Sequence, residues 1–197
     1  NGECAQRMLC QAIIDTRGRD RSGRLPVRLE HAGNMLTEVE TMDFWRRAGA
    51  VPITQASGIW HSAPFVADYA GDYMKSGLRM IRTMLDDGWD VSSSSDASGS
   101  ENLVYSPLFG VQEAVTRQAC TGEILVPGER VSVMEALRMH TAAPARDLGV
   151  SADLGSIESG KRADLVVLGA DPRECDPGQI SNIDIERVYI AGRRFEN

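Results

Sequence analysis

The sequence lacks the features of several specialised classes of protein. Its 197 residues include four cysteines (Cys4, Cys10, Cys120 and Cys175), too few for a disulfide scaffold and without the spacing of a zinc-binding pair. No apolar run approaches the ~20 residues that a membrane-spanning helix needs. Acidic side chains outnumber basic ones by 28 to 21, so no surface for nucleic acid or an anionic membrane is expected. We therefore expect a cytoplasmic protein with reduced thiols.

What is present is a globular composition in which strand and helix patterns alternate. Hydrophobic residues make up 42% of the chain and charged residues 25%. Apolar positions at helical spacing predict an opening helix over residues 4–13. Strand patterns follow at residues 27–31, 50–55 and 90–94, with helical patterns at 37–48, 78–86 and 107–120. The alternation predicts an α/β fold with a parallel sheet.

Two capping boxes predict where helices begin. Thr37 is followed three residues later by Glu40, and Ser132 by Glu135, so each pair can satisfy two free backbone N–H groups. After residue 148 the pattern changes to short β segments at residues 165–168, 187–190 and 194–195, which predict an antiparallel sheet. We therefore expect two units, residues 1–148 and residues 149–197.

Polar residues at the C-terminal ends of the predicted strands are the candidates for chemistry. His31, Gln55 and Asp96 occupy such ends, where functional residues of parallel α/β folds gather. Imidazole nitrogen and carboxylate oxygen are good zinc ligands, and a carboxylate can also move the proton of an attacking water. From the residues alone, a hydrogen-bonded histidine at a strand end and an aspartate in a turn are the commoner explanations.

Two further histidines have weaker signals. His61 lies beside Trp60 in a stretch that we expect to be a loop, where it could contact a substrate or simply face solvent. His140 falls inside a predicted helix, where packing or solvent exposure is a commoner role than catalysis.

Longer motifs resemble the metal-dependent amidohydrolases. Residues Ser132–Leu168 contain a helix that leads into a Thr-x-x-x-Ala pattern, followed by G-x-I-x-x-G-K-x-A-D-L-V-V-L, which is similar to the C-terminal signature of that superfamily. Arg28–Ala32 resembles the sixth barrel strand with its metal-binding histidine, and Ser94–Ala97 resembles the eighth-strand segment with its aspartate. The chain is most similar to amidohydrolase family 3, the exoenzyme-like branch that includes N-substituted formamide deformylases.

This resemblance implies a particular fold. Residues 1–148 would be the C-terminal portion of a (β/α)8 TIM barrel, namely its last βα units and C-terminal helices, and residues 149–197 would be strands of a small β-sandwich subdomain. A complete barrel takes about 250 residues. The family's H-x-H pair, bridging residue and fifth-strand histidine have no counterpart here. We therefore expect an N-terminal half that is missing from this sequence, or a homo-oligomer that compensates for it.

The resemblance also implies a function. It predicts a hydrolase that cleaves a non-peptide C–N bond of a small-molecule amide or N-formyl amine with the help of one or two zinc ions (Zn2+). His31 and Asp96 would bind metal, Asp96 would also transfer protons, and His61 and Trp60 would contact the substrate. Deamination and ring opening of a cyclic amide are alternatives within the superfamily. A truncated, non-catalytic module is the alternative outside it, and we expect this fragment alone to bind metal weakly.

Overall fold

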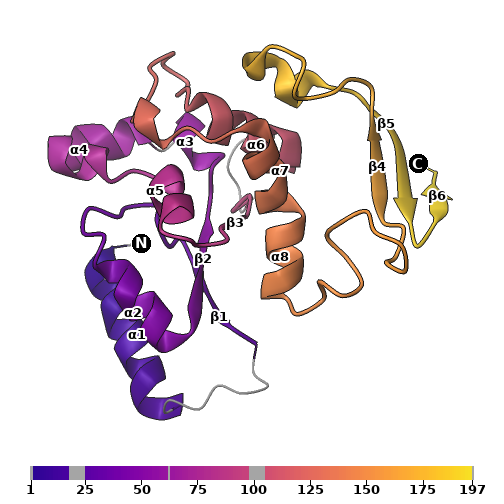
Figure 1. Cartoon of the computed structure of the whole chain (residues 1–197). Coiled ribbons are helices and arrows are strands. Elements are labelled where there is room, and N and C mark those ends of the chain that lie inside the picture. The colour runs from indigo at the N-terminus through magenta and orange to yellow at the C-terminus, as the bar shows by residue number, and fades with distance from the viewer. Residues whose placement is uncertain (1, 18–24, 62, 98–104, 197) are drawn as a thin grey trace.

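Three parallel strands form the sheet that carries the strand-end residues. The computed structural model describes residues 2–17, 25–61, 63–97 and 105–196 (Figure 1). Strands β1 (Val27–Glu30), β2 (Ala50–Thr54) and β3 (Ser92–Ser93) are arranged in the order β1-β2-β3, with both pairings parallel. The prediction of an α/β fold with a parallel sheet is confirmed. The described residues form no closed barrel.

Helices connect these strands and pack around them (Figure 1). Helix α1 (Glu3–Arg17) lies against α2 (Thr41–Ala48), which ends where Gly49 adopts a left-handed conformation at φ 61°. The remaining α-helices among the described residues are α3 (Gly58–His61), α4 (Ala63–Ser76), α5 (Ile81–Asp86), α6 (Pro107–Thr116), α7 (Val133–His140) and α8 (Ala142–Asp147). Two 3₁₀ turns, η2 (Pro127–Glu129) and η3 (Pro177–Asn182), complete this set.

The expectation of a loop around Trp60 and His61 is wrong, because α3 and the start of α4 occupy that stretch. Pro64 lies in the first turn of α4, where proline is tolerated because its missing N–H has no helical partner. The glycine within α4, Gly71, has φ 75° and divides that helix at a kink.

Of the two predicted capping boxes, one is confirmed. Ser132 caps α7, because its side chain accepts from the Glu135 N–H while the Glu135 carboxylate accepts from the Ser132 N–H. Thr37 does not cap a helix, since α2 begins four residues later, at Thr41. Its N–H and hydroxyl instead donate to the Glu3 carboxylate at 2.7 and 2.8 Å. A tertiary contact with α1 has replaced the local one.

The C-terminal segment forms a second sheet of the predicted antiparallel kind. Its strands are β4 (Leu165–Leu168), β5 (Ile185–Ile190) and β6 (Arg193–Phe195), paired in that order. Helices α7 and α8 lie between this sheet and the parallel one (Figure 1). The segment is also tied to the main core, because Ile180 of η3 is fully buried there and the Ser181 N–H donates to Gln112 Oε1 of α6 at 3.0 Å.

No helix among the described residues is long and apolar enough to cross a membrane.

Two charged side chains lie entirely within the protein. Glu113 of α6 and Arg117, the residue after that helix, are both 0% exposed. The Arg117 guanidinium donates to the backbone oxygens of Leu78, Arg79 and Leu125 at 2.7, 2.9 and 2.6 Å. These bonds satisfy the buried charge and fix the backbone at residues 78 and 79. Burial raises the pKa of Glu113 to about 8.

The buried Glu113 carboxyl predicts how stability depends on pH. Its pKa of about 8 in the folded protein exceeds the ordinary 4.5, so the unfolded chain loses this proton first as the pH rises. The free energy of unfolding should therefore fall between pH 4.5 and 8, by at most about 1.4 kcal/mol per pH unit from this group. Urea unfolding of Glu113→Gln across that range should show a smaller fall. The exposed Glu186→Gln is the control, and an equal fall in both variants would contradict the assignment.

Candidate active site at the ends of the parallel strands

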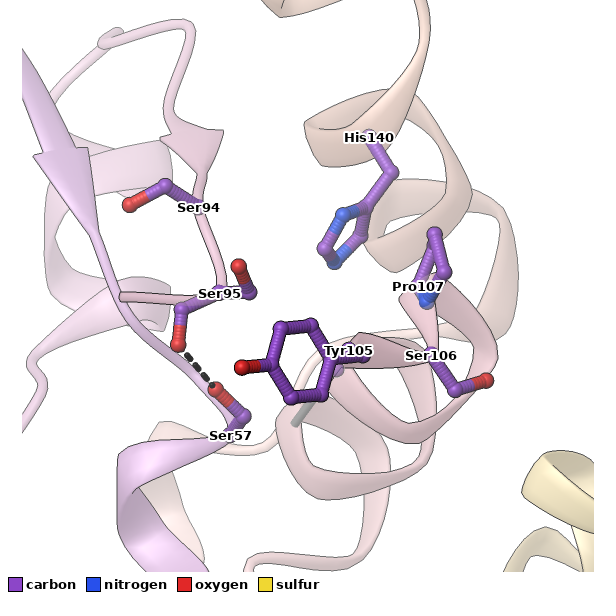
Figure 2. Close-up of a pocket in the computed structure, with 8 residues that line it drawn as sticks. Ser57, Ser94, Ser95, Tyr105, Ser106, Pro107 and His140 are labelled. Carbon is purple, nitrogen blue, oxygen red and sulfur yellow. Dashed lines mark hydrogen bonds between the residues drawn. The ribbon is translucent and has the colours of Figure 1, made fainter. Parts of the chain in front are cut away.

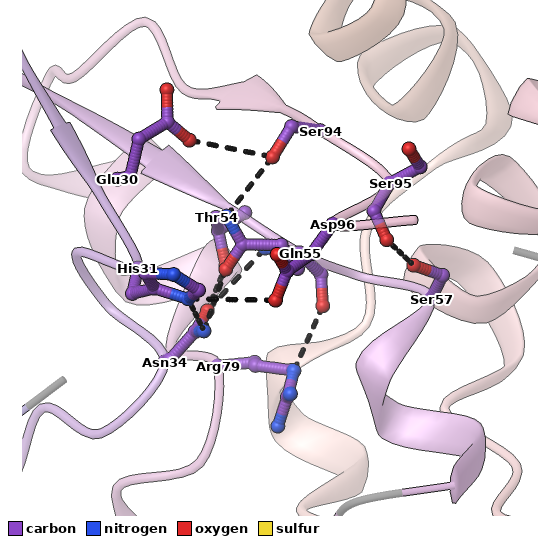
Figure 3. A network of polar contacts seen from close by, with 10 residues as sticks. All are labelled: Glu30, His31, Asn34, Thr54, Gln55, Ser57, Arg79, Ser94, Ser95 and Asp96. Atoms are coloured by element: carbon purple, nitrogen blue, oxygen red, sulfur yellow. Dashed lines mark hydrogen bonds and ion pairs between the residues drawn. The ribbon is translucent and has the colours of Figure 1, made fainter. Parts of the chain in front are cut away.

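The parallel sheet brings the two predicted metal ligands together (Figure 3). His31 directly follows β1 and Asp96 lies beyond the end of β3, so both are at the C-terminal edge of the sheet, on either side of β2. His31 Nδ1 is 4.0 Å from Asp96 Oδ2, with side-chain exposures of 34% and 53%. The pair is accessible to a small molecule from solvent.

Both residues have an unusual backbone conformation. The φ angles of His31 and Asp96 are 64° and 50°, in the left-handed region that residues other than glycine seldom adopt. Each such residue costs roughly 1–2 kcal/mol. Strain of this kind is concentrated at functional sites, where the surrounding structure maintains it. Four further described residues share it, Arg79 beside this edge and Arg117, Val126 and Ala191 elsewhere in the chain, so the conformation alone does not mark the site.

An amide network holds the histidine in place (Figure 3). Asn34 is buried between β1 and β2, and its Oδ1 accepts from the Gln55 backbone N–H at 3.3 Å and from the Thr54 hydroxyl at 3.0 Å. Its Nδ2 lies 2.6 Å from Gln55 Oε1 and 3.3 Å from His31 Nδ1. Because a backbone N–H can only donate, the Asn34 oxygen must face Gln55 and its NH₂ must face the histidine.

This orientation determines the tautomer of His31. An amide NH₂ can only donate, so Nδ1 of the imidazole must accept and therefore carries no proton. The ring proton is then on Nε2, and the Nδ1 lone pair lies on the side of the ring nearest Asp96 Oδ2. That lone pair already accepts from Asn34 Nδ2 at 3.3 Å, so a metal ion could bind Nδ1 only after this hydrogen bond breaks. Asn34 thus fixes the orientation of the His31 ring.

The network continues across the sheet to Glu30. Gln55 Nε2 donates to Ser94 Oγ at 2.9 Å, and the Ser94 hydroxyl donates in turn to Glu30 Oε2 at 3.4 Å. The donor and the acceptor of each hydrogen bond follow from the orientation of the Asn34 amide, which the Gln55 backbone N–H fixes. Residues at the ends of all three strands are therefore connected through oriented side chains.

A buried cation lies close to the site. Arg79 is 6% exposed, and its Nε donates to the Gln55 backbone oxygen at 2.8 Å. Gly58 leaves room for it, since a Cβ there would be 2.2 Å from Arg79 Nη2. Burial, and then the nearby Arg117, lower the pKa of Arg79 to about 10, while Asp96 acts in the opposite direction. Arg79 thus places positive charge where it attracts the Asp96 carboxylate.

The two donor atoms lie farther apart than two ligands of a tetrahedral zinc ion. Bonds of roughly 2.0–2.2 Å at the tetrahedral angle place two donors about 3.4 Å apart, whereas His31 Nδ1 and Asp96 Oδ2 are separated by 4.0 Å, so the side chains would have to move closer to share an ion. Catalytic zinc sites usually have three protein ligands. The part of the chain that the structure describes contains no cluster of three or more His, Cys, Asp or Glu. His31 and Asp96 thus offer two possible donor groups rather than three.

The predicted substrate-contact residues lie in α3, a few residues beyond Gln55. The Trp60 ring meets Phe109 edge to face, with centroids 5.9 Å apart. His61 Nδ1 is buried and has no hydrogen-bond partner among the described residues. Nothing in this geometry tests their predicted contact with a substrate, which stays a prediction.

Sequence reasoning missed Asn34 and Arg79. Asn34 follows Gly33, and such a pair is typical of a turn, so its local pattern gave no sign of a tertiary role. Arg79 is isolated in sequence from every other residue of the site, and no local signal could have revealed it. Its importance depends on the folded backbone.

Comparisons with known proteins agree with this geometry. A model of the amidohydrolase family matches residues 9–195. An N-substituted formamide deformylase from Arthrobacter pascens is 42% identical over 112 residues, covering 57% of this chain and 20% of the deformylase. A 5-methylthioadenosine/S-adenosylhomocysteine deaminase from Moorella thermoacetica (strain ATCC 39073 / JCM 9320) is 29% identical over 118 residues, covering 60% of this chain and 26% of the deaminase. The chain thus spans about a quarter of their length.

Solved structures share the fold. An uncharacterized metal-dependent hydrolase from Pyrococcus horikoshii OT3 superimposes with a TM-score of 0.69 at 20% identity. The match covers 88% of this chain and 34% of that protein. At this identity the similarity concerns the fold alone.

The role of Asn34 can be tested by NMR. The chain has three histidines, so the ring ¹⁵N signals of His31 can be assigned by substitution. We expect the Nε2–H tautomer in the unsubstituted chain. In Asn34→Asp, where a carboxylate replaces the NH₂ donor, the proton should move to Nδ1. The exposed Asn182→Asp should leave the signals unchanged, and an Nδ1–H tautomer in the unsubstituted chain would contradict the assignment.

Proposed function

The chain belongs to the amidohydrolase family, and from that membership we propose that it is part of a metal-dependent hydrolase that cleaves a non-peptide C–N bond. The observation that carries the proposal is the meeting of His31 Nδ1 and Asp96 Oδ2 at 4.0 Å, although they follow different strands. The proposed substrate is a small amide or an N-formyl amine, which the similarity to the formamide deformylase supports.

In this proposal His31 and Asp96 hold the ion, and zinc is the proposed metal because a nitrogen and a carboxylate oxygen suit it. A bound divalent ion would polarise the carbonyl and lower the pKa of a bound water to about 7. The Asp96 carboxylate accepts the proton of the attacking water and passes it to the departing amine nitrogen. Asn34 orients the His31 ring, while Arg79 attracts the Asp96 carboxylate.

The proposed architecture is the last part of a (β/α)8 barrel in residues 1–148, followed by β-sandwich strands in residues 149–197. Two observations support it. The sheet has β1 and β3 as its outer strands, so further parallel strands can pair with it on both sides. The chain also corresponds to about a third of the Pyrococcus horikoshii hydrolase. The remaining metal ligands would come from the rest of such a barrel, or from another copy of the chain in a homo-oligomer. A cytoplasmic location is part of the same proposal.

Trp60 and His61 are proposed to contact the substrate from α3, which begins shortly after β2 ends. Deamination is the second candidate reaction, because the similarity to the deaminase extends over 118 residues. Both reactions use metal-activated water at a C–N bond, and they differ in whether an amine or ammonia leaves. A non-catalytic role is the third alternative. It is supported by the absence of a cluster of three or more possible metal ligands among the described residues.

Metal binding and turnover test the proposal. By isothermal titration calorimetry, Zn²⁺ should bind the chain weakly, and Asp96→Asn should weaken that binding at least about tenfold because one of two donors is lost. The exposed Asp153→Asn is the matched control.

In the whole protein, Asp96→Asn should abolish release of formate from an N-formyl amine, and near-normal turnover would refute the assigned role. Ammonia release from an aminopurine would favour deamination, and neither activity would favour a non-catalytic module.

A further inference from the structure

A small pocket lies next to the candidate metal site (Figure 2). It has a volume of about 140 Å³ and lies between the segment that follows β3 and the facing ends of α6 and α7. Ser94 and Ser95, which immediately precede Asp96, form one wall. His140, the last residue of α7, forms the opposite wall. We call this cavity the His140 pocket.

The histidine has an unmet hydrogen-bonding group. His140 Nε2 is buried and has no hydrogen-bond partner among the described residues. Burial lowers the pKa of His140 to about 4, so the imidazole is neutral at physiological pH. A buried polar atom without a partner is costly, and its presence calls for an explanation such as a bound molecule. Figure 2 shows the ring pointing into the space between the two walls.

A glycine makes this arrangement possible. A Cβ on Gly110 of α6 would lie 2.8 Å from His140 Nε2 and 2.9 Å from Cε1. Any larger residue at position 110 would push the imidazole from its place. The close approach of α6 and α7 therefore positions the ring at the edge of the pocket.

The lining indicates the kind of ligand. Among the described residues, the side chains that line the pocket are serines, a tyrosine, a proline and the neutral His140, and none of these is charged. An ionic group would therefore lose its hydration without gaining a countercharge from them. The volume of about 140 Å³ is close to the ~150 Å³ of a cavity that holds one benzene molecule, so the pocket takes a group of that size or smaller.

We propose that the His140 pocket binds a small uncharged polar group of the substrate next to the reacting carbonyl, with His140 Nε2 as its hydrogen-bond partner. The inference builds on the proposed function, because Ser94 and Ser95 place the bound group beside the segment that leads to Asp96. The serine hydroxyls and His140 recognise the polar atoms.

Formamide and acetamide are the probes for this pocket. Titration of the chain with either compound should give saturable shifts of the His140 ring signals. His140→Phe preserves an aromatic ring without the nitrogen, and it should weaken binding at least about tenfold, as detected by saturation-transfer NMR of the amide. Formate should bind more weakly than formamide, because the lining has no cation. Tighter binding of formate, or unchanged formamide binding in His140→Phe, would overturn the proposal.

Two glycine variants provide a matched comparison. Gly110→Ala should reduce formamide binding to the same extent as His140→Phe, because the added methyl displaces the imidazole. Gly128→Ala places its methyl in open space and should leave binding unchanged. Circular dichroism checks folding, and if Gly110→Ala does not fold, His140→Phe decides the question alone.

The failure of this inference can be distinguished from failure of the proposed function. Asp96→Asn should weaken Zn²⁺ binding at least about tenfold but retain formamide binding in the metal-free chain. Loss of formamide binding in His140→Phe with Zn²⁺ binding intact supports the pocket. Absence of formamide binding to a chain that binds Zn²⁺ rejects the pocket and leaves the proposed function standing.

Discussion

The candidate site depends on the parallel pairing of β2 with both of its neighbours. Ile53 of β2 pairs with Glu30 of β1 and with Ser92 of β3, so the three strands end at nearly the same position along the sheet. His31 and Asp96 reach the same edge for this reason alone. A slip of one residue in either pairing would turn the following side chains to the other face of the sheet. The register of both strand pairings thus determines whether His31 and Asp96 lie close together.

The cations beneath this edge keep the strand ends in position. Arg117 holds the backbone of Leu78 and Arg79, and Arg79 in turn holds the Gln55 carbonyl at the end of β2. Burying two guanidinium groups carries a desolvation penalty of several kcal/mol each. Their hydrogen bonds to backbone oxygens offset part of it, and removing either side chain would leave buried carbonyls unpaired. The two buried guanidinium groups thus lower the stability of the fold while they hold the backbone at the site in one conformation.

Sequence patterns predicted the parts of this site that depend on local chemistry. The strand patterns placed His31 and Asp96 at strand ends, and the Ser132 capping box predicted the start of α7. The equivalent pattern at Thr37 failed because Glu3, distant in sequence, offers Thr37 a better partner than a helix terminus. Arg79 and Asn34 could not be predicted for the same reason, since their partners lie on other strands. Local sequence patterns thus locate His31 and Asp96, and tertiary contacts orient their side chains.

The chemistry of the site is divided into a charged half and a neutral half. His31 and Asp96 face each other near the buried Arg79, whose positive charge attracts the Asp96 carboxylate. Ser94 and Ser95, which precede Asp96, also line the His140 pocket, and none of its described lining residues is charged. An amide has the same division, because its carbonyl oxygen gains negative charge during hydrolysis while its acyl substituent stays neutral. A substrate bound across the two serines would therefore place each part in the environment that suits it, which a shorter or fully ionic molecule could not do.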